Sequence, residues 1–185
     1  KAPSSDIMNK IARGVLASYS YDENPEDRAV ANVLRQCIEL ISRFSTLAAY
    51  AYQAKLRYYD GKSMYIHNPV PELSTAENFL HLIRPDTQYS KLEADILDLS
   101  LILHAEHGGG NNSSLTVHVV SSADTDTYSA IAAAVGSLKG RRHGGANIRV
   151  VEMMNEIKAN AKDWSNEQEI RDYIYKIAKK EAFDR

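Results

Sequence analysis

Residues 33–48 of the chain read VLRQCIELISRFSTLA, and this stretch decides the fold class. Its apolar residues recur at the spacing of an α-helix, and the pattern runs on to Gly61, where a glycine suits the end of a helix. Pro25 suits the first turn of that helix, because an N–H at that position would have no partner within the helix. We therefore predict one long helix over residues 25–60, and we expect residues 34–52 to be largely buried because apolar side chains surround them.

The sequence on either side of this stretch is also typical of helices. Residues 4–6, Ser-Ser-Asp, can cap a helix whose apolar residues begin at Ile7. Ser74 and Glu77 have the spacing of a capping box, which opens a short helix that ends before Pro85. Further helices are predicted over residues 89–104, 112–122, 126–138, 146–161 and 165–181. We therefore predict an all-α protein.

Composition narrows the function classes. The chain has 185 residues, 22 Lys and Arg against 24 Asp and Glu, and a formal charge of −2, which argues against a general polyanion-binding protein. Cys37 is the only cysteine, so an internal disulfide is excluded, and its apolar neighbours predict a core position. The apolar runs are too short to span a bilayer and the first residues do not form a signal peptide, so we expect a cytoplasmic protein.

Glycines and histidines gather in two segments that carry the candidate chemistry. Residues 104–111 read HAEHGGGN and residues 138–147 read LKGRRHGGAN. In each segment a predicted helix ends, a histidine and glycines follow, and another predicted helix begins. Backbone N–H groups at such a junction can surround a small anion or a carbonyl oxygen. A neutral histidine beside a positive helix end can also donate a hydrogen bond to a carbonyl group.

Two other interpretations of these segments remain open. A metal site could use His104, Glu106, His107 and His118, although their spacing matches neither His-Glu-x-x-His nor a Cys/His zinc site. The basic trio Lys139, Arg141 and Arg142 could hold a phosphate group or could simply form a solvated loop.

The two segments together resemble the citrate synthase family. Residues 104–111 are similar to the family's motif around an active-site histidine, and residues 138–147 are similar to its Leu-x-Gly-Pro-x-His-Gly-Gly-Ala-Asn motif. Residues 126–135 and 74–82 also resemble family segments. The resemblance implies a multi-helical fold that is present in part. Residues 1–105 would then be part of the large helical domain, and residues 106–185 most of the small, coenzyme A-side domain.

The resemblance also implies roles for individual residues. His107 corresponds to the histidine that hydrogen-bonds the thioester carbonyl of acetyl-CoA as its enol forms. His143 corresponds to the histidine that binds and protonates the carbonyl of oxaloacetate. His81 is expected to bind substrate in place of an upstream family histidine, which aligns with Glu77. The loop that receives coenzyme A corresponds to Leu138, Lys139, Gly140, Arg141 and Arg142.

The same resemblance implies partners and alternatives. We expect acetyl-CoA and oxaloacetate as substrates, the coenzyme A thioester as a co-substrate, no tightly bound cofactor and no metal. A homodimer is expected for the full-length enzyme, with neither nucleic acid nor membrane as a partner. Alternatives are a 2-methylcitrate synthase that uses propionyl-CoA, or a non-catalytic helical binding module that retains the motifs.

The chain departs from the family's pattern at two places. The usual proline of the second motif is Arg141 here. The family's catalytic aspartate belongs to a Gly-x-Gly-His…Asp-Pro-Arg motif, and nothing in residues 146–185 matches it. We therefore expect an internal fragment of the enzyme that has no turnover alone.

Overall fold

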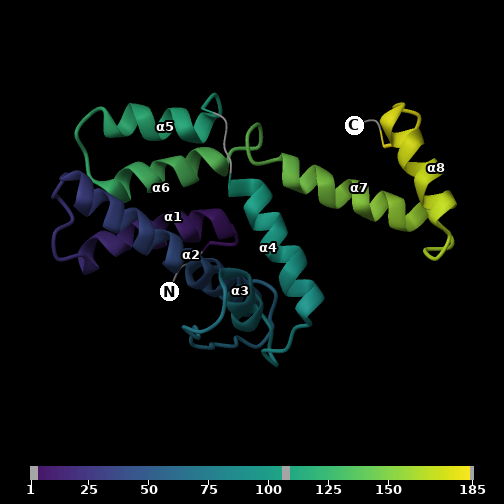
Figure 1. Cartoon of the computed structure of the whole chain (residues 1–185), viewed down its shortest axis with the longest axis horizontal. Helices are drawn as coiled ribbons and strands as arrows, with labels where there is room; N and C mark the ends of the chain where they lie inside the picture. The colour runs from purple at the N-terminus through teal and green to yellow at the C-terminus, as the bar shows by residue number, and fades with distance from the viewer. Residues whose placement is uncertain (1–3, 106–108, 184–185) are drawn as a thin grey trace. The chain divides into compact units, whose positions relative to one another are not determined.

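The computed structural model describes residues 4–105 and 109–183, and the contacts divide the chain into two compact units, Lys1–Lys139 and Gly140–Arg185. All regular elements among the described residues are helical, so the predicted all-α fold is confirmed (Figure 1). The boundary expected between residues 105 and 106 separates the large and small domains of the whole family enzyme. The division after Lys139 separates compact units of this chain, so the expected domain boundary stays a prediction.

Within the described residues, the first unit contains seven helical elements and the second contains two. The first comprises α1 (Ile7–Ser18), the 3-10 helix η1 (Tyr19–Tyr21), α2 (Val30–Tyr58), α3 (Thr75–Ile83), α4 (Lys91–Ala105), α5 (Asn112–Ser121) and α6 (Thr127–Leu138). The second comprises α7 (Ala146–Asn160) and α8 (Glu167–Ala178). The predicted helix over 112–122 and the three that follow it along the chain all form, within three residues of the expected ends.

Local capping residues explain why several helices begin where they do. The Asp6 carboxylate accepts a hydrogen bond from a backbone N–H of the first turn of α1, and Asp126 does the same for α6, each at 2.8 Å. Ser74 and Glu77 form both bonds of the predicted capping box at the start of α3. These contacts lie within three residues of each other in sequence, which is why the pattern alone predicts them.

The predicted start of the long helix at Pro25 is wrong, because α2 begins at Val30. Residues 25–29 instead form a turn that side chains hold together. The Asp27 carboxylate accepts from the N–H of Ala29 at 2.9 Å, and the Asn32 amide donates to the carbonyl oxygen of Asp27 at 2.8 Å. Such local side-chain bonds compete with helix formation and delay the first helical turn.

The core of the first unit lies where α1, α2 and α6 meet. Six residues form its buried centre: Ile11, Val15, Leu40, Ala51, Tyr128 and Val135. Helix α5 packs along α6, α3 packs on α2, and α4 packs on α3 (Figure 1). Thus α6, which leads into the second motif, is one of the best-packed helices of the unit.

Two expectations of burial are wrong. One face of α2 is exposed, with Leu34, Ile38 and Ile41 between 57% and 68% accessible, and Cys37 is half-buried instead of forming part of the core. In α4 only Ala94 is buried. Periodicity shows that a helix has an apolar face, but the packing of α1, α3 and α6 decides which face the unit covers.

In the second unit, α7 and α8 pack against each other, with Ile157 and Ala161 buried. No helix in the described ranges 4–105 and 109–183 is long and apolar enough to cross a membrane.

Candidate active site

The first motif lies at the junction of α4 and α5. His104 is in the last turn of α4, and its Nδ1 lies 2.7 Å from the carbonyl oxygen of Ser100. Because a carbonyl oxygen only accepts hydrogen bonds, Nδ1 is the donor in this contact. Glu106 and the predicted catalytic residue His107 lie outside the described residues.

Helix α5 begins directly after this motif, as predicted. The Asn111 side chain accepts a hydrogen bond from the N–H of Ser114 at 2.9 Å and so caps the helix. The motif therefore leads into a helix N-terminus, where unpaired backbone N–H groups and the helix dipole favour a negative charge.

The second motif forms a tight turn between the end of α6 and the start of α7. The N–H groups of His143 and Gly144 both donate to the carbonyl oxygen of Gly140, at 2.9 and 2.8 Å. Gly145 caps α7, and a Cβ at this position would collide with the carbonyl oxygen of Arg141. The glycine is therefore required by the close approach of two backbone segments. His143 is half-buried at this turn.

The predicted coenzyme A loop is largely exposed. Leu138 is half-buried at the end of α6, whereas Lys139, Gly140, Arg141 and Arg142 are exposed. The Lys139 ammonium lies 3.7 Å from the Asp6 carboxylate. Neither arginine forms an ion pair with another residue that the structure describes. The basic side chains thus remain accessible to solvent, although a neighbouring carboxylate offsets part of the charge of Lys139.

His81 and Glu77 lie together on α3 but have different surroundings. The Glu77 carboxylate is used by the capping box. His81 is half-buried in the last turn of α3, where its ring lies 5.7 Å from the ring of His67. His67 was not predicted as a site residue, because it belongs to a loop and approaches His81 only in the folded chain.

No group of three or more His, Cys, Asp or Glu side chains within residues 4–105 and 109–183 is arranged to hold a metal ion. The metal interpretation that included Glu106 and His107 falls partly outside those residues.

A buried polar network anchors the N-terminal end of α6. The Asp22 carboxylate, whose side chain is 1% exposed, accepts hydrogen bonds from the Tyr128 hydroxyl at 2.6 Å and from the Arg35 guanidinium at 2.8 and 3.0 Å. The Gln36 amide also donates to it, at 3.1 Å, and the Thr127 hydroxyl donates to the Gln36 side-chain oxygen. The network joins the turn after η1 to α2 and α6.

This network shifts the acidity of both central groups. Burial alone would raise the pKa of the Asp22 carboxyl, but the hydrogen bonds from Tyr128, the Asn24 N–H, Arg35 and Gln36 hold its pKa well below the usual range. Burial and the hydrogen bond to Asp22 raise the pKa of Tyr128 to about 12. Sequence reasoning missed this network. The sequence feature that could have indicated the network is Gln36, a polar residue within the apolar pattern of α2.

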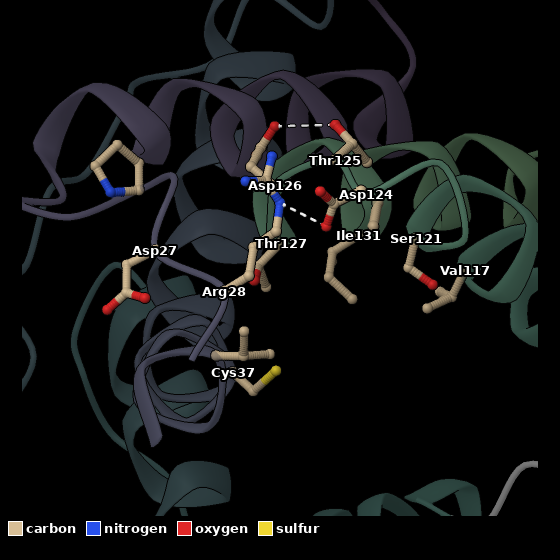
Figure 2. Close-up of a pocket in the computed structure, with 13 residues that line it drawn as sticks. Asp27, Arg28, Cys37, Val117, Ser121, Asp124, Thr125, Asp126, Thr127 and Ile131 are labelled. Carbon is tan, nitrogen blue, oxygen red and sulfur yellow. Dashed lines mark hydrogen bonds and ion pairs between the residues drawn. The ribbon is translucent and has the colours of Figure 1, made fainter. Parts of the chain in front are cut away.

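A pocket of about 270 Å³ also opens in the first unit, between the start of α2, the end of α5 and the start of α6 (Figure 2). Val33, Cys37 and Ile131 give it apolar walls, and Arg28 pairs with Asp124 across 3.1 Å. None of the predicted site residues lines this pocket, so it is not the candidate active site.

Comparison with known proteins decides the family. A family model described as "Citrate synthase, C-terminal domain" matches residues 1–184. The chain belongs to the citrate synthase family. Both motifs fall within the matched residues, so the resemblance drawn from the motifs is confirmed, as is a multi-helical fold.

Relatives of this chain carry the names of two enzyme activities, citrate synthase and 2-methylcitrate synthase. Citrate/2-methylcitrate synthase of Bacillus subtilis is 32% identical over 154 residues, which cover 83% of this chain and 39% of the relative. Citrate synthase of Deinococcus radiodurans is 35% identical over 144 residues, covering 78% and 35%. 2-Methylcitrate synthase of Mycobacterium tuberculosis is 43% identical over 98 residues, covering 52% and 24%. The chain therefore spans two-fifths or less of the length of these relatives.

Proposed function

We propose that the full-length protein condenses acetyl-CoA with oxaloacetate and hydrolyses the resulting thioester to citrate and coenzyme A. The observation that carries this proposal is the family match over residues 1–184, which includes both histidine–glycine motifs in the family's order. The position of each motif directly before a helix N-terminus supports it, because condensation develops negative charge on carbonyl oxygens.

In this proposal one histidine acts on the thioester carbonyl group and another on the ketone carbonyl group of oxaloacetate. His107 donates a hydrogen bond to the thioester oxygen as a methyl proton leaves, and so stabilises the enol. His143 gives a proton to the ketone oxygen of oxaloacetate as the new carbon–carbon bond forms. His81 binds substrate. The loop from Leu138 to Arg142, exposed from Lys139 onward, receives coenzyme A, whose phosphates suit the arginine side chains.

We propose that residues 1–185 alone give no turnover. The enol forms only if a base removes the methyl proton, and residues 146–185 contain no match to the family's aspartate motif. Citrate formation by the purified 185-residue chain would contradict this part of the proposal.

A second candidate is the same condensation with propionyl-CoA, which gives 2-methylcitrate. It is favoured by relatives named 2-methylcitrate synthase, one of which is 43% identical over 98 residues. One methylene changes the selectivity of a pocket by only about 1–3 kcal/mol, so the two substrates are tested side by side.

The decisive experiment measures coenzyme A release by the full-length protein with oxaloacetate and either thioester. We expect His107→Ala and His143→Ala each to lower kcat by about 10²–10⁴-fold with the helical circular dichroism unchanged. His118→Ala is the matched control, because His118 is an exposed histidine of α5. Full activity in both variants would refute the assigned roles of the two histidines. No coenzyme A release by the unmodified full-length protein with either thioester would favour a non-catalytic helical module.

A further inference from the structure

Three rings meet where the loop between α2 and α3 passes the end of α3. The ring of His67 stacks on Tyr65, with centroids 6.5 Å apart and planes 17° apart. His67 also contacts His81, with centroids 5.7 Å apart and planes tilted by 54°. His67 therefore contacts both a loop tyrosine and the histidine to which we assign substrate binding.

The backbone on both sides of this contact is fastened to α2. The Gln53 side chain, 1% exposed, donates to the carbonyl oxygen of Ile83 at 3.0 Å and accepts from the N–H of Tyr65 at 3.1 Å. The Tyr50 hydroxyl donates to the carbonyl oxygen of His67 at 2.8 Å. One buried glutamine thus holds both the loop of His67 and the end of α3, which keeps the two histidine rings adjacent.

The buried Nε2 of His67 has no hydrogen-bond partner among the residues that the structure describes, and no other buried side-chain nitrogen or oxygen in those ranges shares this condition. An unpaired buried polar atom is costly, so such an atom in a native protein calls for an explanation. The half-buried ring of His81 lies next to it, with its centroid 5.7 Å from that of His67, and carries two nitrogen atoms that could serve as the partner.

We infer that His67 is a positioning residue for His81, and this inference rests on the proposed function of the site. A neutral imidazole has one donor and one acceptor nitrogen. A substrate carboxylate only accepts, so the outer nitrogen of His81 must carry the proton. Its inner nitrogen is then an acceptor, which the Nε2–H of His67 satisfies. The pair fixes one tautomer and one orientation of His81 toward the substrate.

Ring ¹⁵N–¹H correlation spectra of the 185-residue chain test the pairing without any need for activity. We expect a single tautomer for His81, a mixture of tautomers in His67→Ala, and recovery of the single tautomer in His67→Gln, whose amide is a donor of similar reach. His118→Ala, on α5, is the control and leaves the His81 signals in place. An unchanged His81 tautomer ratio in His67→Ala overturns the inference.

Kinetics of the full-length protein test whether His67 affects the binding of oxaloacetate. His67→Ala is expected to raise KM for oxaloacetate roughly tenfold with kcat nearly unchanged, and His67→Gln to restore most of it. A shifted tautomer ratio with an unchanged KM overturns the positioning role. If the full-length protein turns over neither thioester, the proposed function fails, whereas the tautomer ratio still decides whether His67 orients His81.

Discussion

Replacement of Tyr128 by phenylalanine removes one hydroxyl group from the centre of the first unit. Tyr128 is fully buried, and its hydroxyl donates to the Asp22 carboxylate at 2.6 Å. The phenylalanine ring fills the same apolar space, so the loss is confined to one hydrogen bond to a buried charge. Arg35 and Gln36 still bind the carboxylate in the variant.

The magnitude follows from the kind of bond. A hydrogen bond to a charged group contributes about 1.5–3 kcal/mol, and the burial of both partners places Tyr128→Phe in the upper half of that range, about 2–3 kcal/mol. For a domain of this size 1 kcal/mol shifts Tm by about 3–5 °C, so we expect Tm to fall by roughly 6–15 °C. The assay is thermal and urea unfolding, followed by circular dichroism.

Tyr19→Phe is the matched control for this prediction. The Tyr19 hydroxyl donates to the Glu26 carboxylate at 2.7 Å, nearly the same distance, but that bond is exposed. Water replaces an exposed partner, so this variant should lose much less stability than Tyr128→Phe. Equal losses in the two variants would refute the reasoning, because burial would then not determine the strength of the bond.

Three further variants test other parts of the structure. Gly145→Ala should disorder the turn before α7 and speed its amide exchange, because a Cβ meets a backbone carbonyl there. Gly136→Ala, in an open position of α6, should stabilise the chain by about 0.5–1 kcal/mol. Gln53→Leu leaves two backbone groups without their partner and should cost about 2–4 kcal/mol in chemical unfolding.

Asp22→Asn should change how stability depends on pH. The folded pKa of Asp22 is lowered, so its contribution is present above the unfolded pKa of about 3.9 and is lost as the pH falls toward the folded value. The variant is less stable at neutral pH but should lose less additional stability between about pH 5 and pH 2. Parallel acid-unfolding curves for the two proteins would contradict the lowered pKa.

The sequence predicts what depends on residues close together along the chain. The capping box of Ser74 and Glu77, the caps at Asp6 and Asp126 and the restart of a helix after the first motif all rest on contacts within three residues. The start of α2 was misplaced because the bonds of Asp27 and Asn32 compete locally with the helix, and periodicity does not record that competition.

The same distinction between local and non-local contacts applies to the candidate site. The family resemblance located both motifs, and the sequence predicted that each lies between two helices. The need for glycine at position 145 appeared only with the fold, because it arises from the carbonyl of Arg141. The contact of His67 with His81 likewise depends on Gln53, which holds two separate segments to α2.

By itself, then, the sequence determined the all-α class, the succession of helices and the family, because caps, periodicity and motifs are properties of short segments. Tertiary structure alone decided which helical faces are covered and which polar groups meet. Tyr128 and Asp22, which form a hydrogen bond, are 106 residues apart in the chain. The leucines of α4 are exposed although they recur at the helical spacing that is also typical of buried leucines. Burial and non-local pairing depend on how helices pack, which no local pattern specifies.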